Sequence, residues 1–125
     1  MSKKYLTIDD ISSYKIAYDL SNYVWNVVIN WNYFALKTIG NQFVRSIDSI
    51  SANIAEGFGR YNKKEKIHFY RYSQGSIIES KDWNAKARAR SLLKDEEDQY
   101  ICDKLTKLPK EVNTLIKFTR DKLSE

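Results

Sequence analysis

The fold is decided by residues 39–60, which read IGNQFVRSIDSISANIAEGFGR. The large apolar residues of this stretch recur at steps of four, four, three and four, and they are Ile39, Phe43, Ile47, Ile50 and Ile54. This is the spacing of one face of an α-helix, whereas the period-two alternation of a strand fails here. Gly57 and Gly59 follow, and glycine is the residue that most readily takes the left-handed conformation at a helix C-terminus. The stretch predicts a helix over about 34–56.

Helical spacing also precedes this stretch. We expect a first helix over about 9–30, with Thr7 or Asp9 as its N-cap and acidic residues in its first turn. Its predicted apolar face consists of Ala17, Leu20, Val24, Val27, Val28 and Trp31. A second apolar stripe beside it contains Tyr14, Tyr18 and Trp25, so this helix is expected to make contacts on two sides.

Two more helices are expected after residue 60. The third spans about 62–90, with Asn62 as N-cap and Glu65 in the capping-box position. One side of it gathers Phe69, Ser73, Ser76, Ile77, Ser80, Trp83 and Ala87. The fourth begins with four acids at 95–98, and its inward seam is Ile101, Leu105, Leu108, Val112, Leu115 and Thr119. Pro109 is expected to kink this helix or divide it.

Composition supports a single helical domain over residues 1–125. The chain has 4 Gly and 1 Pro, which suits a few long helices better than many short strands. Its one cysteine, Cys102, excludes an intrachain disulfide and is expected to be an apolar filler rather than a nucleophile. The N-terminus does not resemble a signal peptide, and no stretch approaches the ~20 apolar residues of a membrane span. We therefore expect a cytoplasmic protein with an antiparallel up-down-up-down four-helix bundle.

The positive charge is concentrated in one segment. The net charge of the chain is +5, and residues 60–90 contain nine basic and three acidic residues. At about 100° per residue, six of these cations fall within an arc of about 120°, and they are Arg60, Lys63, Lys64, Arg71, Lys81 and Arg88. Such a face is typical of proteins that contact phosphate backbones. A solvated lysine-rich helix surface is the alternative, and the apolar Ile67, Tyr70 and Ile78 on the same arc would suit a subunit interface.

Residues 45–60 resemble the signature of the bacterial four helix bundle protein family, which includes proteins encoded within intervening sequences of 23S rRNA genes. The resemblance rests on SANIAEGFGR at 51–60, and it extends through Lys64-Glu65, the run at 67–70 and Gly75-Ser76. It implies an antiparallel bundle that assembles into a ring, of about five subunits. It also implies kinship with the accessory protein of diversity-generating retroelements, a pentameric barrel that binds a reverse transcriptase and nucleic acid. RNA, DNA or a reverse transcriptase are thus the expected partners beside the chain itself.

No catalytic, metal or cofactor site is predicted. The motif residues Ser51, Asn53, Glu56, Gly57 and Gly59 are interpreted as structural or interface residues. A catalytic role for Glu56 would need a positioned partner, and its nearest acidic neighbour, Asp48, is eight residues away. His68 is the only histidine, so one chain cannot form a multi-histidine metal site. We expect a non-enzymatic protein that engages nucleic acid through its third helix, or alternatively a protein-only assembly scaffold.

Overall fold

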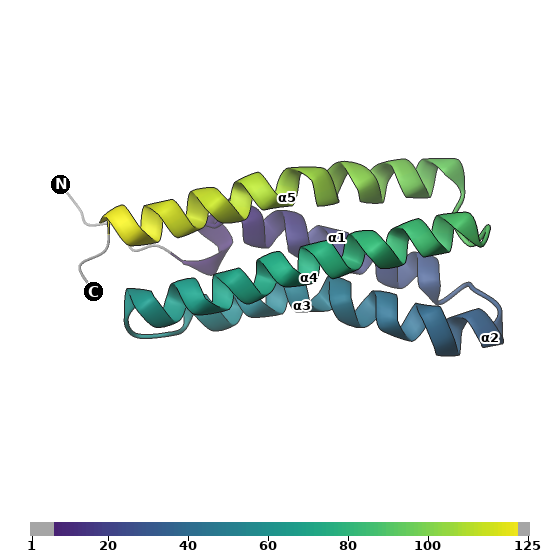
Figure 1. The fold of residues 1–125 in the computed structure, drawn as a ribbon, viewed down its shortest axis with the longest axis horizontal. Coiled ribbons are helices and arrows are strands. Elements are labelled where there is room, and N and C mark those ends of the chain that lie inside the picture. Colours follow the sequence, from purple (N-terminus) through teal and green to yellow (C-terminus); the bar gives the residue numbers. More distant parts are fainter. Residues whose placement is uncertain (1–6, 123–125) are drawn as a thin grey trace.

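Four long helices pack side by side in the computed structural model, which describes residues 7–122. They are α1 (Ser12–Val28), α3 (Asn41–Phe58), α4 (Lys63–Ala89) and α5 (Asp95–Lys122). Both α1 and α4 pack against α3 and α5, and the chain reverses direction at each end of the bundle (Figure 1). Residues 7–122 contain no strand. The predicted all-α four-helix bundle is confirmed, whereas ring formation stays a prediction.

The core lies along the axis of the bundle and is built from the predicted apolar lines. Phe43, Ile47, Ile50 and Ile54 of α3 have no exposed surface. The predicted faces of the first and fourth helices are buried in the same way, from Ala17 to Val28 and from Ile101 to Thr119. Trp31 is only half-buried, because it follows the end of α1.

The first helix begins later than predicted. Residues Ile8–Asp10 form a separate 3-10 turn, η1, in which the Asp10 carboxylate accepts the Thr7 backbone N–H at 2.8 Å. Ile11 is then extended and buried, so α1 starts at Ser12. The prediction that the first helix starts at about Asp9 is wrong. The capped turn at Thr7 and the extended, buried Ile11 separate residues 8–10 from α1.

The second long helix is continuous from α2 (Tyr33–Ala35) through η2 (Leu36–Gly40) into α3. Asn32 caps its start, because its side chain accepts the Ala35 N–H at 3.0 Å. The η2 segment is a π-helical turn in which the Thr38 hydroxyl donates to the Phe34 carbonyl at 2.7 Å. A side-chain donor at that carbonyl competes with the backbone bond and favours a local change of helical pitch.

The two glycines of the motif do not end the helix in the left-handed conformation, and that prediction is wrong. Gly57 lies inside α3, and the cap residue Gly59 has a φ of −80°. Gly57 is buried, and a Cβ added there would lie 2.7 Å from ring carbon Cε1 of Tyr70. Close approach to α4 therefore requires this glycine, rather than a special backbone angle.

The third helix starts as predicted, because the Asn62 side chain accepts the Glu65 N–H at 2.9 Å. Its buried line is shifted, however, and consists of Tyr70, Ser73, Ile77, Ser80, Asn84 and Ala87. Phe69, Ser76 and Trp83 are only half-buried. The Ser73 hydroxyl donates to the Ile50 carbonyl at 2.9 Å, so small hydroxyl side chains let α4 lie close to α3.

The fourth helix runs through Pro109 without interruption, so this proline does not divide it, whereas the alternative of a kink stays a prediction. Among residues 7–122, no helix is both long and apolar enough to cross a membrane. Lys3 and Lys4, which enter the prediction about a signal peptide, lie outside the described residues.

Candidate nucleic-acid interface

Three cations follow the outer surface of α4 and have no acidic partner among the described residues. Lys64, Arg71 and Lys81 are all exposed, and we call them the α4 ridge. With a rise of about 1.5 Å per residue, they extend over about 25 Å of helix. This length spans several phosphates of a nucleic-acid strand, so the ridge can make more than one backbone contact at once.

Lys63 lies at the edge of this ridge and forms a hydrogen bond to α5. It is half-buried in the first turn of α4, and its Nζ donates to the Arg120 carbonyl at 3.0 Å. Arg120 is in the last turn of α5, where unpaired carbonyls favour a cation. Lys63 therefore joins two helix ends and contributes its charge from a fixed position.

Arg60 does not belong to the predicted face. It follows α3 in the turn before α4, rather than lying on the third helix. Its guanidinium pairs with the Glu56 carboxylate at 2.6 Å and lies 4.6 Å from the centre of the Phe69 ring. The structure thus corrects the position of Arg60, which lies before the third helix, and its exposed pair with Glu56 is one that a phosphate can replace at little cost.

Arg88 lies on the third helix as predicted, and it forms an exposed ion pair with Asp95 at the start of α5. The hydrogen bond to Asp95 raises the pKa of Arg88 above its usual value. Between the two helices, Ser91 takes a φ of 60°, a left-handed conformation that returns the chain. The pair closes this turn, and it leaves Lys81 as the last unpaired cation of the ridge.

The apolar residues of the predicted arc separate into buried and exposed ones. Tyr70 is 2% exposed and belongs to the core, and burial raises its pKa to about 12. Ile67 is half-buried. Ile78 is 70% exposed and lies between Arg71 and Lys81 along the helix. The ridge is therefore basic with one apolar residue in its middle.

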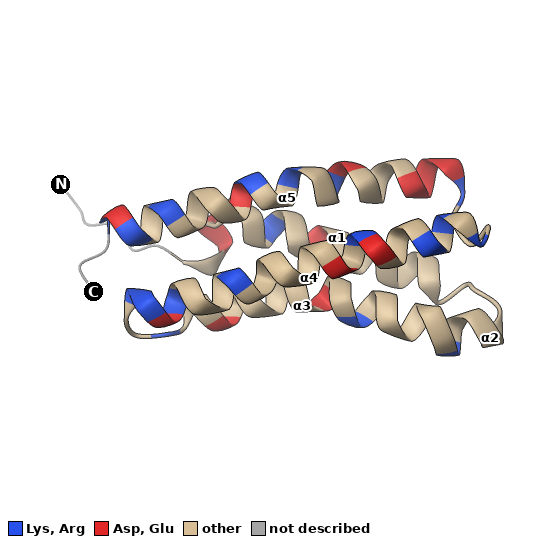
Figure 2. Cartoon of the chain, in the orientation of Figure 1, with Lys and Arg blue, Asp and Glu red and all other residues tan. Residues whose placement is uncertain are grey.

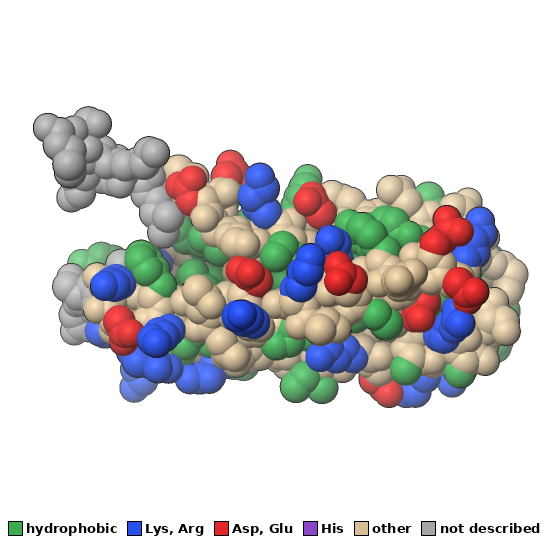
Figure 3. Space-filling model, turned by 90° about the horizontal axis from the view of Figure 1, so that it is seen from above, with side chains coloured by type: hydrophobic (Ala, Val, Ile, Leu, Met, Phe, Trp, Pro, Cys, Tyr) green, Lys and Arg blue, Asp and Glu red, His purple; other side chains and the backbone are tan. Residues whose placement is uncertain are grey.

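Charge is unevenly distributed along the bundle. Figure 2 shows basic residues at the start of α4 and acidic residues at the start of α5, which lie at opposite ends of the molecule. Viewed from above, basic side chains gather over the start of α4 (Figure 3). The acids in the first turn of α5 are Asp95, Glu96, Glu97 and Asp98. A polyanion would thus be attracted to the start of α4 and repelled from the start of α5.

The motif residues have structural contacts. Asn53 donates to the Ser49 carbonyl at 2.8 Å, and Ser51 donates to the Asp48 carbonyl at 3.4 Å, both within α3. Glu56 is exposed and pairs with Arg60. Gly57 makes room for the Tyr70 ring. These contacts account for the motif as packing and local hydrogen bonding within one chain.

The remaining reactive side chains do not assemble a site. His68 is exposed, and its Nε2 lies 2.7 Å from the Tyr72 hydroxyl. Cys102 is exposed rather than an apolar filler, and burial by its neighbours together with Asp98 raises the pKa of its thiol. A raised pKa keeps a thiol protonated and unreactive. No group of three His, Cys, Asp or Glu side chains within residues 7–122 is placed to hold a metal ion.

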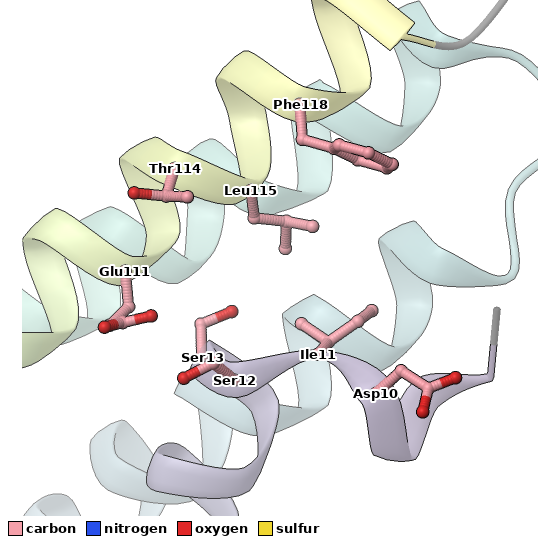
Figure 4. A pocket seen from close by; sticks show the side chains of 8 residues that line it. All are labelled: Asp10, Ile11, Ser12, Ser13, Glu111, Thr114, Leu115 and Phe118. Carbon is pink, nitrogen blue, oxygen red and sulfur yellow. The ribbon is translucent and has the colours of Figure 1, made fainter.

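A small hollow of about 280 Å³ opens between the start of α1 and the end of α5 (Figure 4). Its apolar lining includes Ile11, Leu115 and Phe118, and the carboxylates of Asp10 and Glu111 lie at its edge. The Ser13 hydroxyl is buried there and has no hydrogen-bond partner among residues 7–122. Because acidic groups border this hollow, it does not extend the basic surface.

A second group of cations was missed by sequence reasoning. Lys37 in η2 approaches Lys86 and Arg90 near the end of α4 around a hollow of about 500 Å³. Lys86 and Arg90 were counted in the basic segment, but they fall outside the predicted arc. Lys37 comes from another helix, so only the packing of α4 against the second helix brings the three together.

Comparison with known proteins now identifies the family. The model of the 23S rRNA-intervening sequence protein family matches residues 9–114. The chain belongs to this family. The matched region contains all of the α4 ridge and most of α5.

A crystal structure at 1.70 Å of another protein shows the same fold. That protein, of unknown function and from the S23 ribosomal protein family of Bacteroides thetaiotaomicron, superposes with a TM-score of 0.74 at 18% sequence identity. The match covers 84% of this chain and 98% of that one. No curated protein matches this chain. The family and its fold are therefore shown, and the function is inferred from the surface.

Proposed function

We propose that this family member is a non-enzymatic, homo-oligomeric protein that binds nucleic acid, alone or as nucleoprotein, through the α4 ridge. The observation that carries the proposal is the row of exposed, unpaired cations at Lys64, Arg71 and Lys81. Cations along one helix contact phosphates without reading bases, so the expected binding is salt-dependent and has little sequence preference.

Charge reversal on the ridge tests the proposal. The variant K64E/R71E/K81E should lose at least about tenfold in affinity for labelled RNA or DNA, because three attractive contacts become repulsive. The matched control is K15E/K110E/K117E, which has the same net charge but changes exposed lysines on α1 and α5. Fluorescence anisotropy gives both affinities, and circular dichroism checks that both variants stay helical. Equal losses in the two variants would contradict a localised interface.

A protein-only assembly scaffold is the second candidate. It is favoured by large apolar side chains that a lone bundle leaves exposed, among them Ile78 at 70%, Trp25 at 54% and Ile29 at 49%. Contiguous exposed apolar residues are typical of interaction surfaces. The family resemblance leads us to propose self-association into a ring, of about five subunits.

Multi-angle light scattering tests the self-association that both candidates share, and the nucleic-acid binding measurement separates them. A multimer that binds no RNA or DNA even at low salt would favour the scaffold. A monomer at micromolar concentration would contradict the ring, and would leave the nucleic-acid proposal to the anisotropy measurement.

A further inference from the structure

An aromatic and basic groove lies on the molecule between the second helix and the end of α4. Phe34, Lys37 and Thr38 line one side of it, and Trp83, Lys86 and Arg90 line the other. Its volume is about 500 Å³. We propose that this groove holds a single-stranded nucleic acid, with a base stacked on Phe34 and phosphates bound by the three cations.

The charge of the lining points to a phosphate-bearing ligand. Three cations and no carboxylate line the aromatic groove. The hollow beside Lys81 and Arg88 contains the carboxylate of Asp98, and the one beside Arg60 and Lys64 contains that of Glu65. The aromatic groove is therefore better suited to an anion than these two. Lys86 pairs with Asp82 at 2.7 Å in an exposed pair, which a phosphate can replace at little cost.

The rings of the groove are suited to unpaired bases. Phe34 is 78% exposed and Tyr33 beside it is 72% exposed, so both rings present a face to solvent. Lys37 lies 5.2 Å from the centre of the Tyr33 ring. Exposed rings beside cations bind single strands, since every base has a face that can stack. Bases within a duplex are already stacked and are not available to Phe34.

The groove lies on a different side of α4 from Lys81, the ridge residue nearest to it in the sequence. At about 100° per residue, Lys86 and Arg90 are rotated by about 140° and 180° from Lys81 around α4. The groove is therefore a second basic surface, separate from the end of the ridge. This inference rests on the proposed function, because it names single strands as the form of nucleic acid that this protein binds.

The groove is shaped by the π-helical turn η2, which contains Lys37 and Thr38. Such turns are frequent at functional sites, where they redirect side chains. Two copies meeting through the same groove would oppose like charges, which disfavours a symmetric pair of chains as the occupant. The described ends of the chain lie at the other end of the bundle, away from α2 (Figure 1).

The test compares two labelled strands with identical phosphates, one of deoxythymidines and one of abasic sites. Phe34→Ala should weaken binding of the base-bearing strand about tenfold and leave the abasic strand unchanged, because only stacking is removed. Tyr61→Ala is the matched control, since Tyr61 is 93% exposed and precedes the start of α4, far from the groove. The variant K37Q/R90Q should weaken the binding of both strands.

Three results would overturn the inference. They are an unchanged affinity of Phe34→Ala for the base-bearing strand, an equal loss for both strands, and a changed oligomer mass with unchanged affinity. The last would make the groove an interface between copies of the chain. Failure of the proposed function looks different, because then neither strand binds the unaltered protein.

Discussion

Gly57 and Tyr70 show how one residue of the family motif sets the distance between two helices. The Tyr70 ring is buried against the backbone of α3 where Gly57 has no side chain. A Cβ at Gly57 would lie 2.7 Å from the ring and 2.9 Å from the Lys66 carbonyl oxygen. Because one of these neighbours is backbone, the contact cannot relax by rotation of a side chain alone.

Gly57→Ala should therefore lower the free energy of unfolding by about 1–3 kcal/mol through overpacking. Gly75→Ala is the control, because nothing lies within 4 Å of a Cβ there, and alanine should stabilise that helical position by about 1 kcal/mol. Urea denaturation measures both changes. A stabilised Gly57→Ala protein would show that α3 and α4 are not in close contact at this position.

Tyr70 also predicts a pH dependence. Its pKa is raised to about 12 in the folded state, from an ordinary value of 10.0, because burial disfavours the phenolate. The stabilising effect is complete below pH 10 and is lost as the pH rises towards 12, since the unfolded chain ionises first. The loss should approach about 2–3 kcal/mol at the upper end of this range. Tyr70→Phe should lack this part of the alkaline destabilisation in parallel denaturation curves, and identical curves would contradict the assignment.

At the residue scale, sequence reasoning located the cations but not their partners. The Arg60–Glu56 pair is four residues apart and so lies within reach of a helical argument. The pair of Arg88 with Asp95 depends on the left-handed conformation of Ser91. No local sequence pattern predicts this conformation. Of the six predicted cations, the three of the ridge have no acidic partner among residues 7–122, and Lys63 lies at their edge.

At the scale of the elements, the apolar periodicity predicted all four long helices, because each buries one continuous stripe. The starts capped by side chains, such as that of α4 at Asn62, were also predictable. The break at Ile11 and the π-helical turn η2 were not predictable. A capped 3-10 turn causes the first, and the hydrogen bond from the Thr38 hydroxyl to the Phe34 carbonyl favours the second. The shift of the α4 core line to Tyr70 and Asn84 depends on where α3 and α5 lie.

The cap at Asn62 gives a prediction at this scale. Asn62→Ala removes the acceptor for the Glu65 N–H and should cost about 1 kcal/mol of stability. Asn62→Ser keeps an oxygen acceptor at the same place and should be nearly neutral. Thermal unfolding of the two variants compares them directly. Equal melting temperatures would mean that the cap does not stabilise α4.

For the whole molecule, the basic start of α4 and the acidic start of α5 lie at opposite ends (Figure 2). A strand attracted to the start of α4 can follow the ridge, while the carboxylates in the first turn of α5 repel it locally. Net charge and the position of the basic segment were readable from the sequence. The separation along the bundle required the chain to reverse between α4 and α5.

The most direct test of the account is the dependence of nucleic-acid affinity on salt concentration. A plot of the logarithm of the association constant against the logarithm of the salt concentration has a slope of about −0.7 to −0.9 per phosphate contact. Changing Lys64, Arg71 and Lys81 together to Gln should reduce the magnitude of this slope by about 2 to 3, because each cation contributes one contact. An unchanged slope, or an affinity indifferent to salt in the unaltered protein, would contradict binding through the α4 ridge.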